Sequence, residues 1–180
     1  MQAILGSFAR FRNVIVAGGL GLLGDGCCQV IERRPSYDSR RGSAIACFNA
    51  VYLGAFVQYV FRVYPRVSSG LAKRFMWNPR YERARTSIVA TGIDNCVHVP
   101  FIYIPAFYGS VGLMQGDSFQ TVRENLRRQW WSSTCQCVSF WVPLQAFNFY
   151  AVAQRNRVMV VACANFVWTV WLDLVVHSEP

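Results

Sequence analysis

Two acidic residues, each followed four positions later by a polar partner, are the clearest candidates for chemistry in this sequence. They are Asp25 with Gln29, and Asp94 with His98. Residues four apart share one face of a helix. Both pairs lie in long apolar stretches, where a carboxyl group is costly unless it is paired or hydrated. We therefore expect both acids to face the interior of the protein or a cavity.

A third polar set occurs nearer the C-terminus, where Trp141, Gln145 and Asn148 follow the helical spacing i, i+4, i+7. Two interpretations of these polar residues stay open. They form interhelical hydrogen bonds that fix packing, or they line a path for a solute or a proton. No nucleophile–base pair and no set of metal ligands accompanies them in the sequence. We therefore expect a protein that is not an enzyme and that carries no cofactor and no metal.

A glycine pattern just before Asp25 raises a different possibility, a dinucleotide-binding turn. Residues 17–29 read AGGLGLLGDGCCQ, in which Gly19, Gly21 and Gly24 fit G-x-G-x-x-G. That fingerprint also needs a preceding strand and, about 20 residues later, an acid at the end of a second strand. The later acid, Asp38, follows arginines instead of an apolar strand. The stretch therefore indicates a membrane helix whose small residues permit close packing, and no nucleotide is expected.

The composition favours a membrane protein over a nucleic-acid-binding one. The chain is 53% hydrophobic and 15% charged, with 18 basic residues against 9 acidic ones; soluble domains average about 25% charged residues. All basic residues but Lys73 are arginine, and they lie between apolar stretches, as in polytopic membrane proteins. No nucleic-acid-binding motif is present in the sequence. The seven cysteines are expected to serve as small packing residues, with a redox pair at Cys135 and Cys137 as the alternative.

Five apolar segments must position these residues, and each approaches or exceeds the ~17–25 residues that cross a bilayer as a helix. We predict an all-α polytopic membrane helix bundle of four to five transmembrane helices, forming a single integral membrane domain over 1–180. It includes an N-terminal basic segment at about 1–13 and a long basic loop at 62–86. The acid-poor, arginine-bearing N-terminus suits mitochondrial import. The apolar segments are 14–31, 43–61, 87–114, 130–152 and 158–176.

Several spaced residues carry a resemblance to a known family. Gly24, Asp25 and Gln29 match the motif G-D-x-x-x-Q, while Asp94 and Pro100 match most of D-Q-x-x-x-x-P. The stretch GAFVQYVF keeps the glycine of a further motif, Gly54. The C-terminal region reads WVPLQAFNFYAVAQRNR and then WTVWLD, and its matches in register are Trp141, Gln145, Asn148, Phe149, Val152, Arg157, Trp168 and Leu172.

With these motifs the chain resembles the Mpv-seventeen and peroxisomal membrane protein twenty-two (Mpv/PMP) family. Its members are small integral proteins of the mitochondrial inner membrane or of peroxisomes. The resemblance implies the inner mitochondrial membrane, with the peroxisomal membrane as the alternative, and it implies a channel-like role in small-solute or metabolite homeostasis. The chain departs from the motifs where Val142 and Ala153 replace two prolines and Gln58 replaces a histidine. These departures favour a structural accessory subunit of a larger, respiratory-type membrane complex, with the channel-like role as the alternative.

Arginines beside the apolar segments are candidates for binding lipid head groups. The planar guanidinium group matches phosphate, and basic clusters at helix ends can hold cardiolipin. The alternative is that these arginines set the topology or pair with acids of neighbouring subunits. We expect anionic lipid such as cardiolipin and other membrane subunits as partners. The candidate head-group ligands are Arg33, Arg34, Arg40, Arg41, Arg74 and Arg80.

Overall fold

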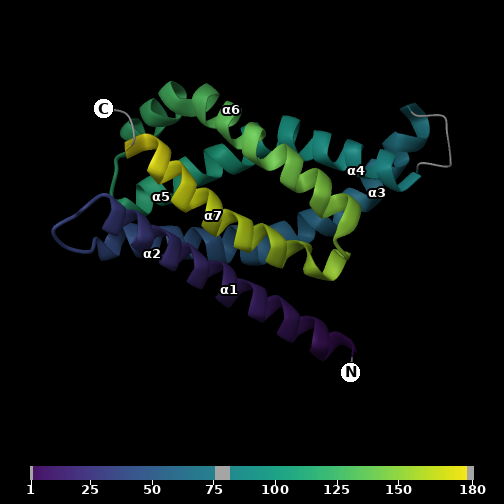
Figure 1. The fold of residues 1–180 in the computed structure, drawn as a ribbon, viewed down its shortest axis with the longest axis horizontal. Coiled ribbons are helices and arrows are strands. Elements are labelled where there is room, and N and C mark those ends of the chain that lie inside the picture. The colour runs from purple at the N-terminus through teal and green to yellow at the C-terminus, as the bar shows by residue number, and fades with distance from the viewer. Residues whose placement is uncertain (1, 76–81, 178–180) are drawn as a thin grey trace. The chain divides into compact units, whose positions relative to one another are not determined.

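The computed structural model describes residues 2–75 and 82–177, and every element within these ranges is a helix (Figure 1). The all-α class predicted from the sequence is therefore confirmed. Two of the helices, η1 and η3, have the wider π-helical hydrogen-bonding pattern, and η4 is a single 3₁₀ turn. In chain order the elements are α1 (Gln2–Ile31), α2 (Ser39–Phe48), η1 (Asn49–Phe56), α3 (Val57–Phe75), α4 (Glu82–Ile93), η3 (Asp94–Tyr103), α5 (Ile104–Gln115), α6 (Phe119–Ala151), η4 (Gln154–Asn156) and α7 (Arg157–His177).

These elements join end to end into long helical stretches that match the apolar segments. By length and composition, three of the described stretches can cross a membrane: Phe11–Ile31, Ser39–Arg74 and Ala84–Gln115. The second and third each consist of an α-helix, a π-helix and another α-helix without a break. The two remaining apolar segments lie in α6 and α7. The chain is a polytopic α-helical membrane protein.

The long basic loop expected at 62–86 is helical over most of its length. The helix α3 continues through its first half, and α4 begins near its end. Within α3, Tyr64 and Ser68 are buried whereas Arg62 and Arg66 are exposed, so the basic residues occupy one face of an amphipathic helix. The expected basic segment at the N-terminus is likewise helical, because α1 begins at Gln2.

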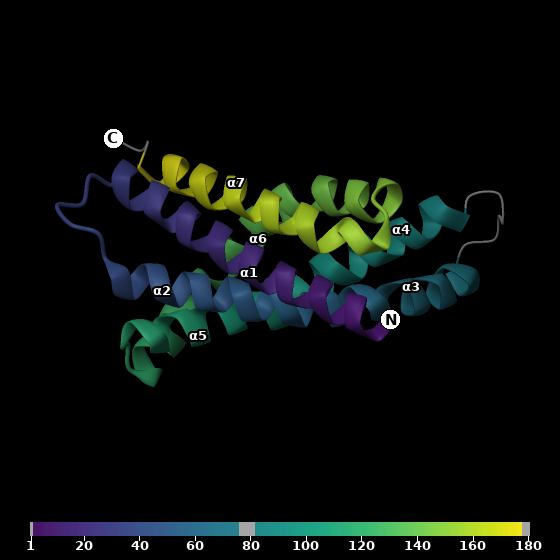
Figure 2. The same cartoon turned by 90° about the horizontal axis from the view of Figure 1, so that it is seen from below.

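The chain divides into two compact units, and the first contains residues up to Gln58 and from Val158 onwards. In this unit α1 packs on α2 and η1 (Figure 2). The approach is close because glycines of α1 face η1. A methyl group added at Gly18 would lie 3.1 Å from the Cβ of Ala50, and one added at Gly21 would collide with Asn49.

The second unit runs from Tyr59 to Arg157. Within it, α6 packs along α4, η3 and α5 (Figure 1). Pro100 lies inside η3, where it has no backbone N–H to donate to the helical ladder. The wider turns of a π-helix are common at such irregular points and at functional sites.

Candidate functional site

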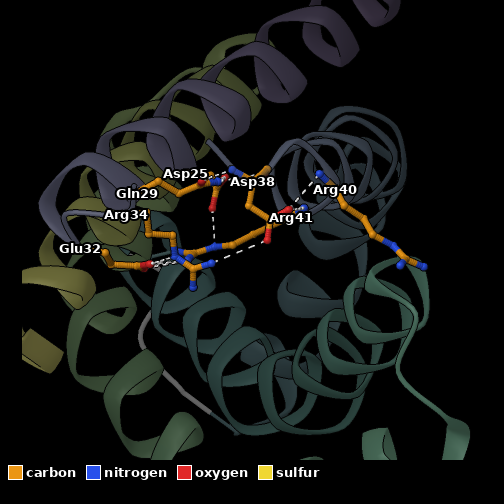
Figure 3. Close-up of polar contacts among 7 residues, drawn as sticks. All are labelled: Asp25, Gln29, Glu32, Arg34, Asp38, Arg40 and Arg41. Carbon is orange, nitrogen blue, oxygen red and sulfur yellow. Dashed lines mark hydrogen bonds and ion pairs between the residues drawn. The ribbon is translucent and has the colours of Figure 1, made fainter. Parts of the chain in front are cut away.

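Asp25 is the centre of a cluster of charged and amide side chains in the first unit (Figure 3). Its side chain is fully buried. The Nε of Arg41, on α2, lies 2.7 Å from Oδ1, and the Gln29 amide donates to Oδ2 at 2.7 Å. The carboxylate is therefore bound by one residue of its own helix and by one residue of the next.

The same glutamine fixes the turn between α1 and α2. The Gln29 Nε2 also donates to the carbonyl oxygen of Asp38 at 3.1 Å, and its Oε1 accepts from the Asp38 N–H at 2.6 Å. The Asp38 side chain in turn caps α2 by accepting from the N–H groups of Arg40 and Arg41. Arg33 adopts a left-handed backbone conformation, with φ of 51°, which bends the chain after α1. The G-D-x-x-x-Q motif thus joins a buried acid to a capped turn.

Glu32 extends this cluster towards the surface. Arg41 Nη1 lies 2.7 and 2.8 Å from its two oxygens, and Arg34 Nε lies 2.6 Å from Oε2. Partial burial acts to raise the pKa of Glu32, but the hydrogen bonds from Arg41 and Arg34 outweigh it and hold the pKa below its ordinary value. Two of the arginines expected at lipid head groups therefore bind acids of this chain.

The other head-group candidates are placed differently. Arg33 and Arg40 are exposed in and beside the α1–α2 turn, and Arg74 is exposed in the last turn of α3. Arg80 lies outside the described residues.

Asp94 is the centre of the second cluster, which lies in the second unit. It is the first residue of η3 and is 2% exposed. Tyr64 donates its hydroxyl to Oδ1 at 2.8 Å, and His98 Nδ1 lies 2.8 Å from the same oxygen. Gln145 donates to Oδ2 at 2.8 Å. Side chains from α3, η3 and α6 thus occupy both oxygens of this buried carboxylate.

Further buried polar atoms lie on α4, η3 and α6 in the second unit. Asn148, which is fully buried, donates to Gln145 Oε1 at 3.0 Å. Several buried side-chain atoms of these helices have no hydrogen-bond partner within the described part of the chain, and such atoms usually bind ordered water. They are Thr91 Oγ1, Asn95 Oδ1, Trp141 Nε1 and Asn148 Oδ1.

The remaining motif residues of the first unit are packing residues. Gly54 is buried in η1, and a methyl group added there would lie 2.5 Å from the Val14 Cα of α1. Glycine at this position therefore lets the two helices touch through their backbones. Trp168, on α7, is 6% exposed.

In the second unit, the motif residues at the end of α6 hold its last turn. Arg157 donates from Nη2 to the carbonyl of Phe149 at 2.9 Å and from Nε to that of Val152 at 3.2 Å. The guanidinium carbon lies 5.3 Å from the centre of the Phe149 ring.

A further motif residue, Pro100, connects η3 to α6. Its carbonyl oxygen accepts a hydrogen bond from the indole N–H of Trp130 at 2.8 Å.

Sequence reasoning did not find three of the polar partners. Tyr64 has no acid at helical spacing in the sequence. Its place on the buried face of α3 became visible only in the structure. Asn165 of α7 donates to Asn49, the first residue of η1, at 3.3 Å. Asparagines inside apolar segments were a usable indication of this second contact, because such residues usually find interhelical partners. Within the described ranges, no group of three His, Cys, Asp or Glu side chains could hold a metal ion.

Comparison with known proteins agrees with the motifs. The model of the Mpv17 / PMP22 family matches residues 112–173. The mitochondrial inner membrane protein Mpv17 of Caenorhabditis briggsae is 25% identical over 162 residues, which is 89% of this chain and 82% of the relative. The same-named protein of Danio rerio is 25% identical over 96% of this chain and 92% of its own length. Protein SYM1 of Eremothecium gossypii is 26% identical over 96% of this chain and 91% of its own length.

No solved structure matches the chain. The relatives extend over nearly all of its length, and those named Mpv17 are proteins of the mitochondrial inner membrane, which is where this protein belongs. By these matches the chain is similar to proteins of the Mpv17 / PMP22 family.

Proposed function

We propose that this protein is a non-enzymatic structural component of the inner membrane, an accessory subunit of a larger, respiratory-type complex. The observation that supports the proposal is the engagement of both buried carboxylates. Side chains of the same unit bind Asp25 and Asp94 at hydrogen-bond distance. Carboxylates held in this way fasten helices together and keep a fixed apolar surface available to neighbouring subunits.

A second candidate function is a channel-like role for small solutes. The observation that favours it is the group of buried polar atoms on α4, η3 and α6 that have no hydrogen-bond partner among the described residues. Water bound at these atoms would make the interior of the second unit wet beside Asp94. A polar, hydrated interior within membrane-spanning helices is the usual mark of a solute or proton path.

Anionic lipid, such as cardiolipin, is a further proposed partner. Arg33, Arg40 and Arg74 are exposed at helix ends, where a guanidinium group can reach a lipid phosphate. Arg34 and Arg41 are weaker candidates than Arg33 and Arg74 because acids of the chain already bind them.

Solute release from liposomes separates the two candidate functions. The purified protein is reconstituted into vesicles loaded with a small fluorescent solute, and release is compared with protein-free vesicles. The accessory-subunit proposal predicts release no faster than in protein-free vesicles. Release that the protein accelerates, and that Asn148→Leu abolishes while the exposed-site control Phe147→Leu does not, would support the channel instead.

A further inference from the structure

A small pocket of about 160 Å³ lies in the second unit, at the end of α6. Its polar lining comes from three parts of the chain: α3, the start of α4, and the junction of η4 with α7. The residues that matter for its chemistry are Ser68, Thr86, Ser87, Gln154 and Arg157. We propose that this pocket binds a phosphate group, carried either by an anionic phospholipid or by free phosphate.

Arg157 is the cation of this pocket, and its position is fixed in advance. Its bonds to the carbonyls of Phe149 and Val152 and its stacking on the Phe149 ring hold the guanidinium plane. These contacts orient the guanidinium group at the edge of the pocket lining. A guanidinium group has five N–H donors in a rigid fork that matches the oxygens of phosphate. A fixed cation loses little conformational entropy when an anion binds.

Hydroxyl and amide groups form the rest of the lining. Ser68 donates to the carbonyl of Tyr64 at 2.6 Å, and Thr86 donates to the carbonyl of Glu82 at 2.7 Å. These hydroxyl hydrogens rotate freely, so each can turn from its own helix towards a ligand. The Gln154 amide donates to the Phe61 carbonyl at 3.4 Å. This hydrogen bond is long and therefore weak, so replacing it with a bond to a ligand costs little free energy. Ser, Thr, Gln and Arg are the usual side-chain donors to phosphate oxygens.

The surroundings of the pocket favour an anion at the membrane surface. Arg62 and Arg66 are exposed on α3, and Arg155 is exposed in η4. Such a local excess of basic side chains raises the concentration of anions nearby. The turn between α6 and α7 is exposed, and lipid-exposed irregular backbone does not occur in the hydrocarbon core, which favours a position of the pocket at the level of the head groups. This site includes none of the arginines considered above as lipid head-group ligands, and neither proposed function requires it.

The test uses the full-length protein and two sources of phosphate. In detergent, the thermal midpoint is measured during titration with inorganic phosphate, with sodium chloride at matched ionic strength as reference. In lipid nanodiscs, it is compared between phosphatidylcholine alone and a mixture with phosphatidylglycerol. A midpoint that rises with inorganic phosphate identifies free phosphate as a ligand, and a rise only in the anionic discs identifies the lipid head group. No rise in either overturns the proposal.

Single-residue variants test whether the rise in the thermal midpoint comes from binding in this pocket. Arg157→Gln should weaken phosphate or anionic-lipid stabilisation by about tenfold or more, as expected for a charge-assisted contact. The matched control Arg155→Gln, two residues away, should leave the apparent affinity within about twofold. Because Arg157 also holds the end of α6, Thr86→Val serves as a second variant that keeps this arginine. An apparent affinity that falls equally in Arg155→Gln, or that neither pocket variant changes, would place the binding elsewhere and overturn the proposal.

Discussion

At the scale of single residues, each buried acid contacts one polar residue of its own helix and at least one polar residue of another element. The pairing of Asp25 with Gln29 could be predicted, because helix geometry alone sets the spacing i, i+4. The contacts of Asp94 with Tyr64 and Gln145 could not, since they depend on how α3 and α6 pack on η3. Likewise, nothing in the sequence distinguished Arg41, which binds acids, from its exposed neighbour Arg40.

The Tyr64 contact leads to the first prediction. Tyr64→Phe removes one hydrogen bond to a buried carboxylate, so the free energy of unfolding should fall by about 1–3 kcal/mol. Thermal or denaturant unfolding in detergent measures the change. The control is Tyr59→Phe, because Tyr59 is an exposed tyrosine of the same helix. Equal stability of the two variants would show that the Tyr64 hydroxyl does not support Asp94.

At the scale of elements, the turn between α1 and α2 is held by ion pairs whose strength depends on pH. The pKa of Glu32 is lower in the folded protein than its ordinary value of 4.5. Its stabilising contribution is therefore fully present above that value and is lost as the pH falls through the folded pKa. Between about pH 6 and about pH 3, the unfolding midpoint of the wild type should fall more steeply than that of Glu32→Gln. Parallel curves for the two proteins would show that Glu32 does not carry the effect.

The contact between α1 and η1 gives a prediction about packing. Gly54→Ala would place a methyl group against the backbone of α1 and should destabilise the protein by about 1–3 kcal/mol. Gly19→Ala is the control within α1, because a methyl group at Gly19 meets no atom within 4 Å. Unfolding in detergent compares the two. A Gly54→Ala variant as stable as Gly19→Ala would mean that the helices do not touch at this point.

At the scale of the whole molecule, the apolar lengths and the arginines between them were enough to predict an all-α membrane protein. Each predicted segment falls within one continuous helical stretch, except that Val152, the last residue of one segment, lies just after the end of α6. The continuation of α3 past residue 62 was missed, because basic residues were counted as loop residues although Tyr64 and Ser68 follow a helical spacing. The π-helices could not be predicted, since η1 contains no proline and its sequence pattern does not distinguish it from an α-helix.

The central claim, that this protein is an accessory subunit, is tested most directly by its native size. Mitochondria that contain the tagged protein at its normal level are solubilised in a mild detergent and separated on a native gel, and co-migrating proteins are identified by mass spectrometry. The account predicts that most of the protein migrates in an assembly far larger than its own 20.4 kDa, together with the same partner subunits in repeated preparations. Migration as a single chain, or as an assembly of this chain alone, would contradict it.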